Sequence, residues 1–229
     1  MTGDLLVIVP SRGRPQNIAR MLDSVHATAR AETHVHVAVD DDDPELERYR
    51  YVMKQAAGEG DRLTVGPRKG LTAWTNEIAV PAAEEYPYLA SLGDDHVPGT
   101  PGWDRALIKG VERMGGTGFA YPWDGTREDI PEAVVLSSDI VRALGWMACP
   151  DLDHWYIDNV WADLGRGAGC LRHLRVIAVE HQQRADQTSK DSGERLAADR
   201  DAYYAWRKTR MAGDIKTVAA LREAALQPA

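Results

Sequence analysis

Two adjacent carboxylates and an imidazole, Asp94, Asp95 and His96, follow the apolar segment 88–92 after a single glycine. Neighbouring like charges repel, and burying them at the end of a strand costs several kcal/mol unless a cation or hydrogen bonds compensate. A divalent metal ion would supply that compensation, since carboxylate and imidazole groups are among its usual ligands. A solvated turn, in which an aspartate caps a helix, is the alternative that the motif alone leaves open.

Three more clusters of polar residues follow apolar runs in the first third of the chain. They are 10–15 (PSRGRP) after the run 5–9, 40–43 (DDDD) after 34–39, and 66–70 (GPRKG) after 62–65. If these runs are parallel strands of one sheet, their carboxyl ends, where such sheets bind ligands, lie at one edge. Guanidinium, ammonium and carboxylate groups at that edge suit a nucleoside diphosphate bound together with a divalent cation.

The pattern between the clusters predicts the elements that would position them. Each of the four apolar runs is followed by an amphipathic helix pattern, which begins near Pro15, near Pro44, near Leu71 and after Pro101. Strands that alternate with helices indicate an α/β fold, with a mostly parallel sheet and helices on both faces. Beyond residue 115 the less regular pattern predicts strands at Phe119, 134–136 and 171–179, a helix at 155–164 and two C-terminal helices.

Composition and missing motifs argue against several function classes. The 27 basic and 35 acidic residues give a net charge of −8, which argues against electrostatically driven nucleic-acid binding. Neither a G-x-G-x-x-G fingerprint nor a Walker A sequence is present, so the common dinucleotide and ATP sites are not expected. Two cysteines without metal-binding spacing, and no apolar stretch near the ~20 residues of a membrane span, predict a soluble cytoplasmic protein.

Taken in order, these motifs resemble those of the GT-A glycosyltransferases, within them the small family-2-like enzymes of bacteriophages and bacteria. The segments that carry the resemblance are 7–15 (VIVPSRGRP), 39–42 (VDDD), 70–76, 93–96 (GDDH) with 101–104 (PGWD), and 179–181 (VEH). The resemblance covers about the first 185 residues. It implies a Rossmann-like GT-A sheet, a nucleotide-sugar donor, a divalent metal ion and transfer of the sugar to a hydroxyl group.

The resemblance also implies roles for individual residues. Donor-binding residues would be Pro10, Ser11, Arg12, Arg14, Asp40, Arg68, Lys69, Asn76 and Asp94. The loop 10–12 would border the base, Asp40 would meet the base or ribose, and Asp94 would face the ribose. Gly93 stands where the strict Asp-x-Asp motif of the family has its first aspartate, which leaves the division of labour between Asp94 and Asp95 open.

By the same resemblance, Asp95 and the late histidine His181 would bind the metal. One carboxylate with one imidazole favours Mn²⁺ over Ca²⁺, and Mg²⁺ could substitute. Asp158 has the position of the catalytic base, with Asp153 as the alternative. A base across the cleft from the leaving diphosphate implies an inverting enzyme. Trp123 or Trp155 is a candidate for stacking on a sugar ring.

Two units are expected along the chain. Residues 1–185 would form the nucleotide-sugar-binding and catalytic domain, and residues 186–229 a mobile segment followed by a C-terminal helical extension. The stretch 182–193 contains Arg184 and Lys190 and almost no apolar side chain, so we expect it to become ordered over a bound donor.

Two other functions fit part of the pattern. A nucleotidyltransferase could share the sheet and the metal site, but its glycine-rich basic signature after the first strand is matched poorly by 11–15 (SRGRP). A non-catalytic nucleotide-sugar or carbohydrate-binding module would keep the site without its base. The acceptor is open: phage relatives suggest a hydroxymethylated DNA base or a virion protein. The arginine-rich stretch 200–210 favours DNA, whereas the net charge disfavours it.

Overall fold

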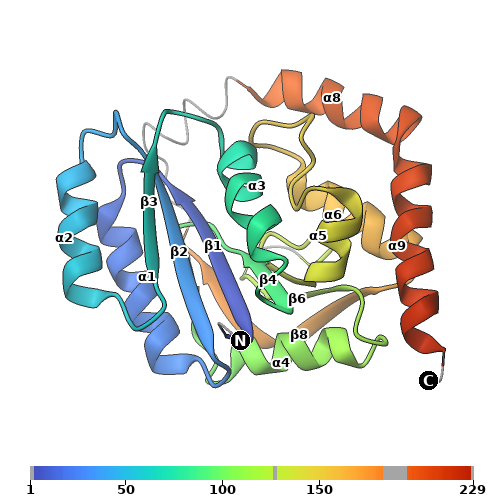
Figure 1. Cartoon of the computed structure of the whole chain (residues 1–229), viewed down its shortest axis with the longest axis horizontal. Helices are drawn as coiled ribbons and strands as arrows, with labels where there is room; N and C mark the ends of the chain where they lie inside the picture. Colours follow the sequence, from blue (N-terminus) through green and yellow to red (C-terminus); the bar gives the residue numbers. More distant parts are fainter. Residues whose placement is uncertain (1–2, 126–127, 183–194, 228–229) are drawn as a thin grey trace.

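The computed structural model describes residues 3–125, 128–182 and 195–227, which form a sheet with helices on both of its faces (Figure 1). Its strands are β1 (Leu5–Ser11), β2 (Thr33–Asp40), β3 (Arg62–Gly66), β4 (Tyr88–Ser91), β5 (His96–Pro98), β6 (Phe119–Trp123), β7 (Val134–Ser137) and β8 (Leu171–His181). Its helices are α1 (Pro15–Thr28), α2 (Leu46–Ala56), α3 (Leu71–Ala82), α4 (Trp103–Glu112), α5 (Ser138–Leu144), α6 (Ile157–Gly167), α8 (Leu196–Thr209) and α9 (Met211–Leu226). The α/β architecture expected from the sequence is confirmed.

The sheet combines a parallel half with a mixed half. Its strand order is β3-β2-β1-β4-β7-β6-β8-β5. The first four strands in this order are parallel neighbours. β7 is antiparallel to both β4 and β6, whereas β8 runs parallel to β6 and antiparallel to β5. The parallel half therefore has one edge at which all of its carboxyl ends meet, as the four polar clusters require.

Side chains alternate across the sheet and divide the core into two layers. Along β1, Leu6 and Ile8 face a cluster that includes residues of α3, α5, α6, α8 and α9. Leu5, Val7 and Val9 face the opposite cluster, with α1, α2 and α4. A strand covered on both faces must be apolar at every position, which explains why residues 5–9 are all aliphatic.

The short strand β5 was not predicted from the sequence. It contains only His96–Pro98, and it pairs antiparallel with the end of β8 so that His96 lies opposite His181. A strand of this length shows no recognisable alternation in the sequence. It nevertheless brings the aspartate pair next to the late histidine.

The two C-terminal helices pack on the body of the fold. Tyr203 and Trp206 of α8 and Val218 of α9 are buried in the same cluster as α3, α5 and α6. The predicted domain boundary near residue 185 lies outside the described residues, as does all but Gln182 of the stretch predicted to order over the donor. Within the described part of the chain, no helix combines the length and apolar character needed to cross a membrane.

We predict that Asp104→Asn destabilises the protein. The fully buried Asp104 carboxylate accepts hydrogen bonds from the backbone N–H groups of Arg30 and Ala31 and from the Thr33 hydroxyl, and so ties α4 to the start of β2. An amide presents one oxygen fewer to these donors, so the free energy of unfolding should fall by about 1–3 kcal/mol in urea denaturation. Asp23→Asn, an exposed substitution on α1, is the control. Equal midpoints for both variants would contradict the assignment.

Candidate functional site

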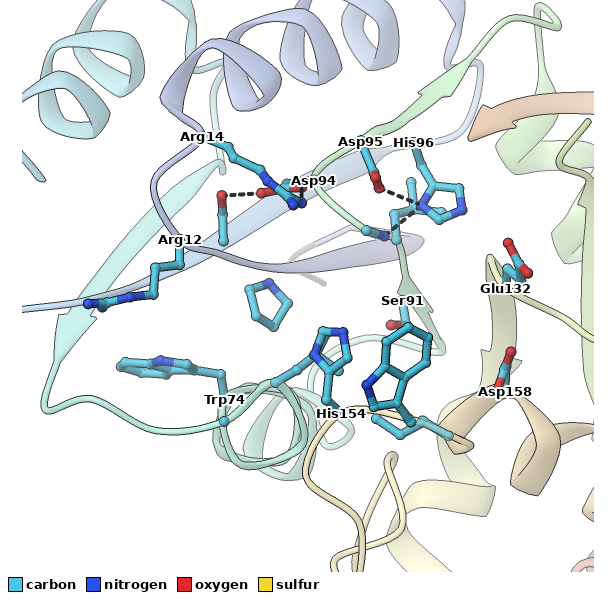
Figure 2. Close-up of a pocket in the computed structure, with 18 of the residues that line it drawn as sticks. Arg12, Arg14, Trp74, Ser91, Asp94, Asp95, His96, Glu132, His154 and Asp158 are labelled. Carbon is cyan, nitrogen blue, oxygen red and sulfur yellow. Dashed lines mark hydrogen bonds and ion pairs between the residues drawn. The ribbon is translucent and has the colours of Figure 1, made fainter. Parts of the chain in front are cut away.

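A cavity of about 650 Å³ opens at the carboxyl edge of the parallel strands. Eleven of the residues predicted for a site line it: Pro10, Ser11, Arg12, Arg14, Asp40, Arg68, Lys69, Asp94, Asp95, Asp158 and His181. In the view of Figure 2, Arg12 and Trp74 lie at one end, and Asp95, His96 and Glu132 at the other. Arg14 and Asp94 lie between them. The topology therefore collects groups that are far apart in the sequence.

Two predicted residues are not among those that line the cavity. The Asn76 amide donates to the carbonyl of Ala148 and accepts from the N–H groups of Met147 and Ala148, so it fixes a loop. This position does not support a contact between Asn76 and a nucleotide. The Asp153 carboxylate pairs with Arg195 and packs so closely on Gly70 that a Cβ there would lie 1.7 Å from Asp153 Oδ1. Of the two candidate bases, only Asp158 lines the cavity.

At one end of the cavity, the buried Asp40 carboxylate organises two cationic residues. Its Oδ1 accepts hydrogen bonds from the Trp74 indole at 2.8 Å and from the backbone N–H of Lys69 at 3.1 Å. Its Oδ2 accepts one from the Arg12 guanidinium at 2.9 Å. The Arg12 guanidinium also donates a hydrogen bond to the exposed Asp42. This contact raises the pKa of Arg12, although burial opposes the shift. Asp40 thus fixes the position of Arg12 and of the loop that carries Lys69.

In the middle of the cavity, Asp94 is held by a closed chain of hydrogen bonds. Ser11 Oγ donates to Asp94 Oδ2 at 2.6 Å, and the Arg14 guanidinium reaches Asp94 Oδ1 at 3.2 Å. The Tyr49 hydroxyl accepts the backbone N–H of Arg14 at 2.7 Å and lies 2.7 Å from Ser11 Oγ. Because the Ser11 proton goes to Asp94, Tyr49 must donate to Ser11. Burial raises the pKa of Asp94, although Arg14 and Ser11 oppose the shift.

At the other end, one carboxylate and two imidazoles form a cluster. The rings of His96 and His181 stack with their centroids 4.3 Å apart, as the β5–β8 register requires. Asp95 Oδ2 lies 3.3 Å from His181 Nε2. Glu132, from the loop before β7, lies 2.7 Å from His181 Nδ1. Both nitrogens of the His181 ring therefore face carboxylates.

The electrostatics of this cluster favour positive charge between the carboxylates. Burial alone would lower the pKa of His181, but hydrogen bonds and charges from Asp95 and Glu132 raise it to about 10. Burial alone would raise the pKa of Asp95, but His181 outweighs it and lowers the value. For His96, burial and the nearby His181 lower the pKa to about 4. The same two carboxylates would attract a metal cation, which would displace the proton on His181 Nε2 when it binds.

The geometry at Asp95 and His181 fits a divalent ion. Neighbouring ligands of an octahedral ion at about 2.1 Å lie about 3 Å apart, close to the 3.3 Å between Asp95 Oδ2 and His181 Nε2. Ligand atoms of Asp95, His96 and His181 all lie within 4.8 Å of one another. Glu132 has the position of a carboxylate that orients a ligating histidine through its second nitrogen. His96 Nδ1 already accepts the Gly93 N–H at 2.9 Å, so this nitrogen is occupied. Asp95 and His181 are therefore the better pair of metal ligands.

The wall of the cavity that carries Asp158 comes from the second half of the chain. His154, Trp155, Tyr156 and Ile157 line it just before Asp158, which lies in the first turn of α6. One Asp158 oxygen accepts the backbone N–H of Asn159 at 2.8 Å. Trp155, a predicted sugar-stacking residue, keeps 36% of its surface exposed.

Sequence analysis missed several residues that shape the site. Glu132 lies in an irregular loop without a motif, and Tyr49 reads as an ordinary core position of α2. His154 was not among the predicted site residues, yet it lines the cavity. His96 carried a usable signal, because it stands next to Asp95, but its partner becomes visible only through the pairing of β5 with β8.

No protein family model and no curated protein matches the sequence, but solved structures share its fold. A mannosyltransferase from Pyrobaculum calidifontis in complex with GDP-Man and Mn²⁺ has a TM-score of 0.62 at 12% identity, over 99% of this chain and 76% of that one. Glucosyl-3-phosphoglycerate synthase from Mycobacterium tuberculosis, in complex with Mn²⁺, UDP and glucosyl-3-phosphoglycerate, has a TM-score of 0.62 at 11% identity, over 88% and 77%.

The residue 1–349 portion of TarS from S. aureus, in complex with UDP, has a TM-score of 0.60 at 11% identity. That alignment covers 77% of this chain but only 59% of the TarS chain. Identities this low establish the fold and nothing finer. The protein therefore has the Rossmann-like GT-A fold of these glycosyltransferases, as its sequence motifs led us to expect.

Proposed function

We propose that the protein is a metal-dependent glycosyltransferase, which transfers a sugar from a nucleoside diphosphate sugar to a hydroxyl acceptor with inversion at the anomeric carbon. The observation that carries the proposal is the 3.3 Å approach of Asp95 Oδ2 to His181 Nε2, inside the cavity at the carboxyl edge of the sheet. The fold supports it, because the similar solved structures include glycosyltransferases bound to GDP-Man or UDP with Mn²⁺.

The donor would lie along the cavity from Arg12 towards Asp95. Asp40, Arg12 and Trp74 provide hydrogen-bonding and aromatic groups at the nucleoside end. Asp94 is already bound by Ser11 and Arg14, so its carboxylate is held in one orientation for the ribose. Such preorganisation lowers the cost of ordering side chains when a ligand binds. Lys69 and Arg68 also line this end, where they pair with Glu77 and Asp42.

Asp95 and His181 would hold Mn²⁺ or Mg²⁺, with Glu132 orienting the imidazole. When bound, the cation neutralises the negative charge that develops on the leaving diphosphate. Because Asp95 follows Asp94 in the sequence, the residue that would bind the ion and the residue that would face the ribose move as one backbone unit. This adjacency would fix the spacing between the metal-binding and the ribose-binding carboxylates.

Asp158 would remove the proton from the acceptor hydroxyl. It lines the same cavity as Asp95 but lies on the side formed by α6, in the first turn of that helix. A base on that side accepts the proton while the acceptor oxygen attacks the anomeric carbon from the face opposite the diphosphate. The electrons of the broken bond leave with the diphosphate oxygen, and the configuration inverts.

The acceptor stays a prediction. Several arginines of the C-terminal stretch are paired with carboxylates of the protein: Arg200 with Asp201, Arg207 with Asp163, and Arg210 with Asp151. These pairs reduce the positive charge available to a DNA backbone, so they do not favour a hydroxymethylated DNA base over a virion protein. An array of both acceptor types with a radiolabelled sugar donor would discriminate between them.

Asp95→Ala should abolish metal-dependent nucleotide binding. UDP or GDP with Mn²⁺ at 100 times its Kd should stabilise the wild type by about 2.7 kcal/mol, measured by thermal shift, and should not stabilise the variant. Asp41→Ala removes an equal charge from an exposed position on the same edge and should behave as the wild type. Undiminished Mn²⁺-dependent affinity of the Asp95 variant in calorimetry would refute the metal assignment.

Asp158→Asn should separate binding from chemistry. The amide keeps the shape of the side chain but cannot accept the acceptor proton, so kcat should fall by about 10²–10⁴-fold while donor affinity stays nearly constant. Slow Mn²⁺-dependent hydrolysis of the donor by the wild type, lost in the variant, would distinguish an enzyme from a binding module. An α-linked donor should give a β-linked product by NMR. A retained anomeric configuration or a fully active variant would rule out Asp158 as the base of an inverting reaction.

A further inference from the structure

One face of helix α8 contacts the segment 153–156 at three successive turns. Arg195, just before the helix, pairs with the Asp153 carboxylate. The Asp199 carboxylate accepts hydrogen bonds from the backbone of the segment, and the Tyr203 ring stacks on Tyr156 with centroids 5.0 Å apart. Residues four positions apart lie on the same face of a helix. We call this surface, formed by Arg195, Asp199 and Tyr203, the α8 clamp.

Asp199 makes the most demanding contact of the clamp. Its Oδ1 accepts the backbone N–H of Asp153 at 2.9 Å. Its Oδ2 accepts those of His154 at 2.9 Å and Trp155 at 2.7 Å. The residue is only 4% exposed, so a charged group has been buried on a C-terminal helix to satisfy three consecutive amides of a loop. A buried carboxylate is retained only where specific donors compensate its desolvation.

The segment that the clamp holds leads directly to the proposed base. Tyr156 has a φ of 67°, and it is the only non-glycine residue with positive φ in the part of the chain that the structure describes. A bulky side chain adopts this left-handed conformation only where the surroundings impose it. Asp158 lies two residues further on, in the first turn of α6. The backbone conformation at 153–156 therefore sets where α6 begins and how its first turn is oriented.

We propose that Asp199 is a positioning residue for the transfer reaction: it acts through the backbone of 153–155 to hold the cavity wall and Asp158 in the geometry needed for attack. This inference rests on the proposed glycosyltransferase function. The donor half of the cavity, built on β1, β2 and the Asp94–Asp95 turn, has no contact with Asp199 among those described. Loss of the Asp199 contacts should therefore change turnover and leave metal-dependent nucleotide binding unchanged.

The experiment compares Asp199→Asn with Asp214→Asn. An asparagine at 199 has one oxygen and one NH₂ group where the aspartate has two oxygens. At least one of the three backbone amides therefore loses its acceptor. Asp214 also has a carboxylate contact with α8, where its Oδ2 accepts the Trp206 indole N–H at 2.8 Å, but it makes no described contact with 153–156. Asp199 lies on α8 and Asp214 on α9, but both variants carry the same chemical change at a contact that involves α8, so a general loosening of α8 would affect both.

Two readouts are measured on each full-length variant. Amide hydrogen exchange by NMR, without any ligand, should accelerate by about tenfold or more at residues 153–155 in Asp199→Asn and not in Asp214→Asn. With a nucleotide sugar that the wild type turns over, kcat should fall at least about tenfold in Asp199→Asn, because small misplacements of reacting groups cost large factors in rate. Its Mn²⁺-dependent UDP or GDP affinity should change by less than about twofold.

Unchanged exchange at 153–155, or equal kcat values for the two variants, would overturn the inference. If Asp199→Asn does not fold, Arg195→Gln serves instead, because it removes the ion pair with Asp153 on the exposed side of the same segment. This variant should show a smaller change in both hydrogen exchange and kcat. A result like that of the wild type would again overturn the inference. A wild type that neither binds nor turns over nucleotide sugars would refute the proposed function, and with it the role in transfer, while the exchange result would still decide whether the clamp exists.

Discussion

The pairing of β5 with the end of β8 is the contact on which the candidate site depends. These two segments lie far apart in the sequence, and the register places His96 opposite His181. Two further backbone contacts continue the junction: the N–H of His181 donates to the Asp124 carbonyl, and that of Gln182 to the Asp95 carbonyl. Without this strand pair, Asp95 would be one of two repelling carboxylates at the end of β4, without the His181 imidazole beside it.

Charge compensation organises the rest of the cavity. Asp40, Asp94, Asp95 and Asp199 are each supplied with a different set of donors: an indole with a guanidinium, a hydroxyl with a guanidinium, an imidazole, and three backbone amides. Each set fixes the orientation of its carboxylate before any ligand arrives. The donors that offset the cost of burying each carboxylate also fix its position. A site for a charged, multidentate ligand needs such fixed positions.

The parts of the structure that the sequence predicts are those with strong local signals. Aliphatic runs such as 5–9 mark buried strands, and polar clusters directly after them mark the ligand edge, because parallel topology converts sequence position into spatial position. Contacts made by single residues from irregular segments leave no such signal. Glu132 and Asp199 are ordinary acidic residues in the sequence, and Asn76, which lies within a matching motif, is used by the fold to hold 147–148. The missed residues and the unexpected role of Asn76 have one cause: the periodicity of a sequence does not show which distant residues will form hydrogen bonds with each other.

The cavity is supported from two separate directions. Residues up to about 100 build the proposed nucleoside and metal side on the parallel strands, with Glu132 and His181 as later contributions, whereas the wall at 153–161 is attached to α8. The two supports meet where the backbone N–H of Thr72 donates to the Asp153 carbonyl at 3.2 Å, but the described contacts of Asp199 and Tyr203 with the cavity wall fall on 153–156. A substitution in α8 therefore acts first on that wall. If the protein has the proposed transferase function, substitutions in the C-terminal helices would change which acceptor fits the cavity while the donor site keeps its geometry.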